Sequence, residues 1–203
     1  MAIEDESLVK ESLLLEAVNI LLSSIGQVPI ESEADFDVLV EARIARDTLI
    51  EVKRAVLSEG WSFNTDEAWE FPPASPILSA GGGFEIPVPT NVLDAVADNG
   101  DVIVRNWRLY SKSKQSHIFT ETKKCFVVWD MEFDTLTHPL RHYITIRAAR
   151  VFAARVVGDP SAVSYTAADE EDALLACRRS EGRTGNYNMF NSTFGINNRV
   201  RVN

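Results

Sequence analysis

Apolar residues recur at helical spacing through the first part of the chain. Between Ser12 and Ile25 they step by three and four positions, and Gly26 followed by Pro29 supplies a stop signal. After this turn a longer apolar stripe begins and ends near Gly60; its members are Val38, Ala42, Ala45, Leu49, Val52 and Val56. The pattern predicts two amphipathic helices, the second of roughly six turns.

The helical period disappears between Trp61 and Leu136. This segment holds most of the prolines and several short runs rich in aromatic and β-branched residues. Such runs, separated by Pro, Gly and Asn-Gly turns, predict strands. The predicted strands are WSFN, EAWEF, FEIPVP, VIVRNWRLY and KCFVVWDMEF.

Helical spacing resumes at Thr137. This threonine can cap a third helix, with Pro139 tolerated in the first turn, and Gly158 and Pro160 end it. A fourth helix is predicted from about Ser161 to Glu181, with four acidic residues in its first half and two arginines in its last turn. Because the connecting loop is short, the third and fourth helices should form an antiparallel pair.

These elements predict an α+β fold. Residues 1–60 and 137–181 would form a four-helix bundle split two and two. Residues 61–136 would form a β-rich insertion domain between the second and third helices, and residues 182–203 an extended C-terminal docking tail.

Composition narrows the class of protein. The chain has 203 residues, of which 45% are hydrophobic and 25% charged, which is typical of a globular protein. Its net charge of −10 argues against a surface that clamps nucleic acid, because phosphate contacts need clustered Lys and Arg. Cys125 and Cys177 lack metal-ligand spacing and are best explained as buried thiols in a reducing cytoplasm. No signal peptide or membrane span is predicted.

Two clusters could in principle carry chemistry. His138 and His142 are four residues apart, with Asp134 nearby, but a metal site needs more ligands in register and no HExxH arrangement is present. A second cluster combines carboxylates and tryptophans, as in glycosidases: Asp66, Glu67, Glu70, Trp61 and Trp69. Solvated turn residues explain that cluster more simply.

Other catalytic patterns are missing from the sequence. The glycines at 81–83 lack the Lys and Ser or Thr of a phosphate-binding loop, and no GxSxG motif occurs. We therefore predict no catalytic residue, metal or cofactor, and a structural protein rather than an enzyme.

The predicted partner-binding residues lie near the C-terminus. Arg147, Arg150 and Arg155 lie largely off the buried side of the third helix and could pair with the acidic run at 169–172, either within one subunit or across to a neighbour. The pairing within one subunit is the simpler alternative. In the tail, large apolar side chains without a helical period favour a segment that orders on a partner, centred on Tyr187, Asn188, Met189 and Phe190. A free tail is the alternative.

Four segments together resemble the tail tubular protein A family, the head-to-tail adaptors of short-tailed phages. They are LLEAVNILLSSIGQVPI at 14–30, GWSFN at 60–64, FDTLTHPLRHYITIRAARVFAARVVG at 133–158 and ADEEDALLACRRSEGRTGNYNMF at 168–190. The insertion between Trp69 and Met131 is less similar, apart from IPVPTNVLD at 86–94.

The resemblance implies a structural virion protein. It implies a dodecameric ring between the portal protein and the tail nozzle, tail tubular protein B, through whose channel DNA passes without sequence-specific binding. Assembly would take place in the host bacterial cytoplasm, and no membrane is involved. The acidic composition fits such a channel, because carboxylates repel phosphates. The alternative function is a virion-associated glycan hydrolase acting on host surface polysaccharide or peptidoglycan through Asp66, Glu67 or Glu70.

Overall fold

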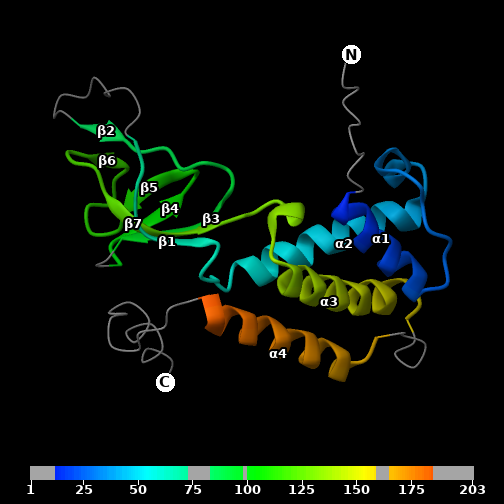
Figure 1. Ribbon diagram of the computed structural model, residues 1–203. Helices are drawn as coiled ribbons and strands as arrows, with labels where there is room; N and C mark the ends of the chain where they lie inside the picture. Colours follow the sequence, from blue (N-terminus) through cyan, green and yellow to red (C-terminus); the bar gives the residue numbers. More distant parts are fainter. Residues whose placement is uncertain (1–11, 73–82, 98–99, 159–164, 185–203) are drawn as a thin grey trace, which may run out of the picture.

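The computed structural model has two lobes that lie end to end, one helical and one built of strands (Figure 1). It describes residues 12–72, 83–97, 100–158 and 165–184. In these ranges the fold combines four α-helices with small antiparallel sheets, so the predicted α+β class is confirmed.

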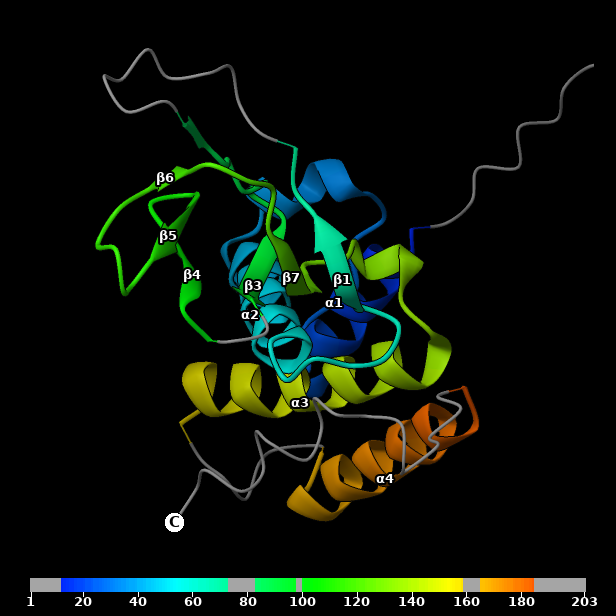
Figure 2. The same cartoon turned by 90° about the vertical axis from the view of Figure 1, so that its left-hand side faces the viewer.

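The helical lobe is organised around one central helix. Its α-helices are α1 (Leu13–Ser24), α2 (Val40–Leu57), α3 (His138–Val156) and α4 (Ala167–Thr184), with short 3-10 helices η1 (Glu33–Asp37) and η2 (Phe133–Thr135). Helix α3 contacts the other three α-helices, and α4 lies on its outer side, away from α1 and α2 (Figure 2). All four contribute to one hydrophobic cluster, in which Leu21, Leu49, Ile144 and Phe152 are fully buried.

The helix ends follow local signals with two exceptions. Helix α1 starts after Ser12, whose hydroxyl accepts a hydrogen bond from the amide of Leu15, and stops before Gly26 at φ 76°. Pro139 lies in the first turn of α3 as predicted, but the Thr137 side chain makes no capping hydrogen bond. The predicted start of α4 at Ser161 is wrong for the described residues: Tyr165 and Thr166 are not helical, and the helix begins at Ala167.

The strand lobe contains one three-stranded sheet and two strand pairs. The sheet has the order β1 (Thr65–Glu70), β7 (Lys124–Trp129), β3 (Val92–Ala97), all antiparallel. Strands β2 (Phe84–Glu85) and β6 (Ile118–Phe119) form one pair, and β4 (Val102–Arg105) and β5 (Arg108–Ser111) form a hairpin. Buried residues from these elements make a second hydrophobic cluster.

Several strand predictions are wrong. WSFN is a turn, not a strand, and VIVRNWRLY is two strands joined by a two-residue turn at Asn106 and Trp107, both with positive φ. The predictions also missed β3 and β6. In the helical lobe Val38, assigned to the buried stripe, is 80% exposed, because it precedes α2.

A polar junction joins the two lobes. The amine of Lys53 on α2 lies 2.7 Å from Asp130, just after β7, and donates to the carbonyl of Met131 at 2.7 Å. Arg54 binds the other carboxylate oxygen at 3.0 Å. The side-chain amide of Asn64 donates to the carbonyls of Leu57 and Trp129, at 3.0 and 2.9 Å.

Asn64 satisfies three backbone groups at a position that is 1% exposed, because its oxygen also accepts from the amide of Trp61 at 2.8 Å. The turn WSFN is thus closed by a side chain that reaches both α2 and β7. This explains why a segment rich in strand-forming residues adopts a turn: the Asn64 amide replaces the ladder bonds of a strand.

We predict that Asn64→Ala destabilises the protein by about 2–4 kcal/mol, because buried backbone groups lose their partners. Urea unfolding followed by circular dichroism measures the loss. Asn91→Ala, at an exposed position, is the matched control and should change stability by less than about 0.5 kcal/mol. Equal stability of the two variants would contradict the role given to Asn64.

Candidate docking surface on helices α3 and α4

Helix α4 is attached to the rest of the molecule by one apolar face and by a contact near its C-terminal end. Ala173 and Cys177 are buried against α3, whereas Leu175 on the outer side is 40% exposed. At the start of the helix, Thr166 and Asp169 of the first turn bind each other's backbone amides, a capping box that satisfies orphan amide groups. Near its end, Glu181 accepts from the amide of Ser62 at 2.5 Å. Helix α4 is therefore anchored to both α3 and the turn after α2.

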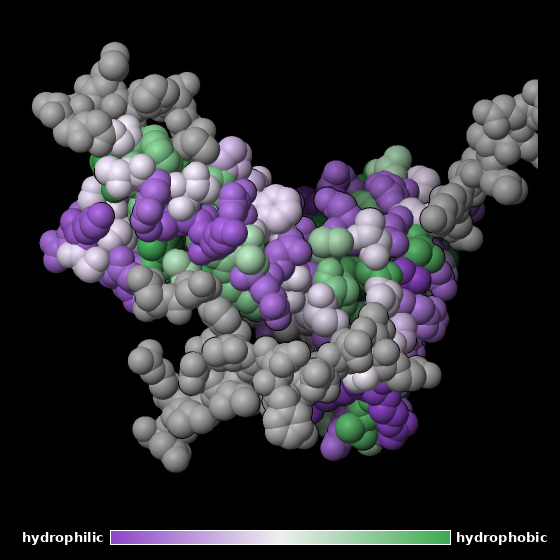
Figure 3. Space-filling view, turned by 60° about the vertical axis from the view of Figure 1, so that its left-hand side comes forward, coloured by the Kyte–Doolittle hydropathy of each residue, from purple (hydrophilic) through white to green (hydrophobic). Residues whose placement is uncertain are grey.

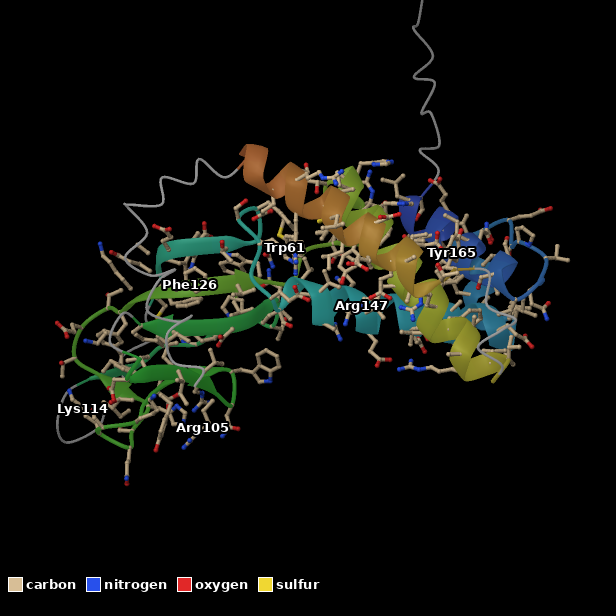
Figure 4. All side chains as sticks on the ribbon, turned by 90° about the horizontal axis from the view of Figure 1, so that it is seen from below. Trp61, Arg105, Lys114, Phe126, Arg147 and Tyr165 are labelled. Atoms are coloured by element: carbon tan, nitrogen blue, oxygen red, sulfur yellow. The ribbon has the colours of Figure 1, made fainter. Side chains whose placement is uncertain are left out.

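Two of the three predicted arginines pair with α4 inside the chain. Arg150 forms a close ion pair with Glu170, and the guanidinium of Arg147 lies 3.7 Å from the same carboxylate. Arg147 also donates to the hydroxyl of Tyr143 at 2.8 Å and approaches Glu59 at 3.8 Å. Figure 4 shows Arg147 lying between helices of this lobe. Pairing within one subunit, the simpler prediction, is thus present for these two residues.

Arg155 takes a different partner. It makes two hydrogen bonds with Glu51 on α2, at 2.7 and 2.9 Å, instead of reaching the acidic run. This bidentate contact lowers the pKa of Glu51, first through the hydrogen bond from Arg155 and then through its charge. The same contact raises the pKa of Arg155. Both groups stay charged over the whole physiological range.

The acidic run is used in three ways. Glu170 binds the α3 arginines, Asp169 belongs to the cap, and Glu171 and Asp172 are exposed. The hydroxyl of Thr166 lowers the pKa of Asp169. The surface of α3 and α4 therefore presents charges that are partly neutralised, with the side chains of Arg147, Arg150 and Arg155 still 34, 35 and 47% exposed. Such a surface can bind a polar partner, and in the absence of that partner these arginine charges are still paired within the chain.

The predicted tail residues Tyr187, Asn188, Met189 and Phe190 lie outside the described residues. Helix α4 continues to Thr184, three residues beyond its predicted end at Glu181. The start of the tail is therefore the C-terminal end of α4.

The carboxylates on β1 do not converge on a cleft. Asp66 accepts from the indole of Trp129 at 2.7 Å, Glu70 pairs with Lys124 at 3.0 Å, and Glu67 is exposed. Trp69 packs edge-on against Trp129, with ring centroids 5.2 Å apart, and does not form an open platform for a sugar ring. Two carboxylates held by partners on a solvated strand lack the burial that a glycosidase acid requires.

His138 and His142 stack on each other, with ring centroids 6.5 Å apart. The third predicted ligand, Asp134, instead accepts from the amide of Leu14. Within residues 12–72, 83–97, 100–158 and 165–184, no three His, Cys, Asp or Glu side chains lie close enough to hold a metal ion. In the same ranges no helix has the length and apolar character of a membrane span.

Sequence reasoning missed the most exposed aromatic of the strand lobe. Trp107, 56% exposed, was assigned to the middle of a strand but occupies a hairpin turn. The available signal was the Asn that precedes it, since Asn tolerates positive φ. On the face shown in Figure 3, apolar residues are interspersed with hydrophilic ones over both lobes and do not form one continuous patch.

Comparison with known proteins agrees with the resemblance found in the sequence. A family model described as tail tubular protein matches residues 15–187 and so spans both lobes. Tail tubular protein A of Klebsiella phage KP34 is 29% identical over 168 residues, which cover 81% of this chain and 84% of that protein.

We predict a weak coupling between Arg150 and Glu170. Because both side chains are partly exposed, a double-mutant cycle of Arg150→Met and Glu170→Gln should give less than about 1 kcal/mol. Urea unfolding of the four proteins measures the coupling, and Arg179→Ala, at an exposed position, is the control. A coupling of several kcal/mol would mean that this pair, rather than apolar packing, holds α4 on α3.

Cys177 reports on the same packing. Burial raises the pKa of its thiol to about 11, with the charge of Glu181 acting in the same direction. In the folded protein we expect alkylation of Cys177 to be slow near neutral pH and to rise about tenfold per pH unit, in proportion to the thiolate. Peptide mass spectrometry after iodoacetamide treatment measures it. Equal rates in native and urea-unfolded protein at about pH 8 would contradict a docked α4.

Proposed function

Because this chain belongs to the tail tubular protein family, whose members are structural components of phage tails, we propose that it is the ring-forming head-to-tail adaptor of a short-tailed phage. In this role it sits between the portal protein and the tail nozzle, tail tubular protein B, as a dodecameric ring. The ring gives passage to DNA during ejection and is assembled in the host cytoplasm. The family match across both lobes is the observation that carries the proposal.

The junction between the lobes supports a role as a building block. In this proposal residues 1–60 and 137–181 form the helical domain and residues 61–136 the inserted domain. Two separate hydrophobic clusters support a division into two bodies, with Trp61, Phe133 and Leu136 of the inserted segment packed in the helical cluster. The contacts of Lys53 and Asn64 fix these two bodies to each other. A subunit that contacts a portal at one end and a nozzle at the other needs this rigidity. If the two domains moved relative to each other, they could not fit both partners in a defined orientation.

Charge supports passage of DNA without retention. Each chain carries a net charge of −10, so a ring of many copies is strongly acidic. Carboxylates that line a channel repel phosphates, which keeps the polymer moving.

The surface of α3 and α4, with the tail that follows Thr184, is the proposed contact to the portal or to a neighbouring subunit. Arg147, Arg150 and Arg155 are held in place by their partners in the chain, so they are preorganised and still partly exposed. Tyr187, Asn188, Met189 and Phe190 are the proposed anchors of the tail. Aromatic and methionine side chains are the residues that interfaces bury.

An enzymatic role has less support. The family is one of tail structure, and the β1 carboxylates are bound by Trp129 and Lys124 on a solvated strand. No observation on the described residues favours a hydrolase over an adaptor.

Deleting residues 185–203 tests the tail. We expect the shortened protein to keep its fold, because both hydrophobic clusters lie before residue 185, and to lose binding to the portal protein of the same phage. Pull-down with purified portal measures binding, and circular dichroism checks the fold. Unchanged capture of portal by the shortened protein would contradict the assignment.

A control for that experiment replaces the four tail anchors by Ser in the full-length chain, which keeps the tail but removes its large side chains. Native mass spectrometry of wild-type protein with portal then gives the stoichiometry. An adduct of twelve copies supports the adaptor ring, and absence of any portal complex rules out the proposed function.

A further inference from the structure

The tip of the β4–β5 hairpin, residues 105–108, carries an unusual side chain for its backbone. Asn106 and Trp107 have φ of 55° and 58°, the left-handed region that a two-residue hairpin turn requires. Asn tolerates this region, but a bulky residue there is a genuine outlier. Gly at the second position would be less strained, so Trp107 is not explained by the turn. Strain of this kind persists at functional sites.

The tip is held rigidly from behind. The carbonyl of Trp107 accepts from the amide of Val88 at 2.8 Å, and the amide of Leu109 donates to Ile86 at 3.0 Å. The guanidinium of Arg105 stacks over the ring of Tyr110 at 3.9 Å. The side chain of Trp107 is nevertheless 56% exposed. A fixed backbone presenting an exposed indole is preorganised for binding, because little freedom remains to be lost.

The segment that contains the hairpin is basic in an acidic chain, and two of its cations, Arg105 and Arg108, flank the tip itself. Lys112, Lys114, Lys123 and Lys124 lie towards the other end of the hairpin, where Val102 pairs with Ser111. Residues 101–124 contain two acidic residues and six basic ones: Arg105, Arg108, Lys112, Lys114, Lys123 and Lys124. Three of the six form ion pairs within the chain, to Glu85, Glu121 and Glu70. Among the described residues Arg105 forms no ion pair, whereas the charges of Lys112 and Lys114 act on Asp101 and Glu121.

A surface of opposite character lies at the far end of the molecule. Residues 31–47, here called the α2 entry surface, contain two arginines and six acidic residues: Glu31, Glu33, Asp35, Asp37, Glu41 and Asp47. Arg46 pairs with Asp37 and Asp47, and Asp35 binds Ser32, so Glu31, Glu33 and Glu41 are the acids without such a partner among the described residues. Three apolar side chains among them are exposed, Val38 by 80%, Val40 by 55% and Ile44 by 37%. Val40 and Ile44 share one face of α2 because they are four residues apart. Figure 1 places this segment at the opposite end from β4 and β5.

We propose that the β4–β5 tip of one copy docks on the α2 entry surface of the next copy, with Trp107 packed against Val40 and Ile44. The inference rests on the proposed function in that it supplies the contact between neighbouring subunits of the ring. Exposed apolar side chains on both surfaces give the contact its centre, and the opposite charges around them orient it. Because the two surfaces are different and lie at opposite ends, the contact is head-to-tail, which is the type that closes a ring.

Two other partners fit less well. Nucleic acid would use cations, but three of the six cations of residues 101–124 are neutralised in the chain, Arg108 at the tip among them, and the net charge of −10 opposes phosphate. The exposed acids of α4, Glu171 and Asp172, precede Leu175 by about one turn, and Leu175 is the one large apolar side chain exposed on α4 in the described part of the chain. The α2 entry surface offers three.

Photocrosslinking tests the contact directly. Trp107 is replaced by benzoylphenylalanine in the full-length chain, and ¹⁵N-labelled and unlabelled copies are mixed, both as concentrated protein at low salt and bound to portal. After irradiation, peptide mass spectrometry should show crosslinks between differently labelled copies at residues 38–44. Crosslinks to α4 or to portal instead, or none between copies in either sample, would overturn the proposal.

Trp107→Gly separates docking from folding. It restores the Asn-Gly turn, so the melting temperature should not fall, whereas association between copies should weaken about thirtyfold or more, as expected for an interface anchor. Sedimentation velocity measures association of the free protein, and the yield of complete rings on portal measures it in the complex. Trp69→Ala, which removes another exposed tryptophan of the same lobe, is the control and should leave association unchanged. A glycine variant that still assembles as well as wild type would overturn the proposal.

The two proposals fail separately. If the protein binds portal but residue 107 crosslinks elsewhere, the adaptor function is supported and the proposed contact between copies is contradicted. If residue 107 crosslinks to residues 38–44 of another copy but no portal complex forms, the contact is supported and the adaptor function is contradicted.

Discussion

The neutralised amine of Lys53 is the constraint on which the arrangement of the two lobes depends. Its side chain is 10% exposed and that of Asp130 is 13%, so each charge is stable only while the other is close. A change in the angle between the lobes would separate α2 from the end of β7 and leave both charges unpaired in a dry environment. Asn64 adds neutral hydrogen bonds beside this ion pair. The helices and strands therefore behave as one body, which is what an assembly subunit requires.

The charged surfaces differ in how far they are neutralised. On α3 the arginines are bound by Glu170 and Glu51, so their charges are largely satisfied before any partner arrives. At the β4–β5 tip Arg108 pairs with Glu85, whereas Arg105 forms no ion pair within the described residues, and the exposed indole of Trp107 lies between these two positions in the chain. Neutralised charges favour contacts of adjustable geometry, whereas unpaired charges around an apolar centre favour a contact of fixed orientation. The two proposed interaction surfaces thus lie on different elements and differ in charge pairing.

Sequence patterns predicted the helices far better than the strands. The stripe of α2 was correct from Ala42 to Val56 because helical period is local and repeated, and only Val38 before the helix was wrong. The strand predictions were wrong where a single residue determined the local structure. Asn64 closes WSFN into a turn through hydrogen bonds to groups distant in sequence. Trp107 occupies a turn that contains no glycine to indicate it. Of the candidate site, the pairing of α3 with the acidic run was predictable from charge and antiparallel order. The partner of Arg155 was not, because Glu51 comes near only when α2 packs on α3.

By itself the sequence determined the α+β class, the four helices, the acidic character and membership of the tail tubular protein family, all of which follow from local period, composition and ordered motifs. Only the tertiary structure decided how Lys53 meets Asp130, which arginines are neutralised, and that the lobe of β4 and β5, with the exposed Trp107, lies at the opposite end from the acidic α2 entry surface. The physical reason is the distance along the chain over which each interaction acts. Secondary structure depends on neighbours a few residues away, whereas charge pairing and exposure depend on residues that folding alone brings together or holds apart.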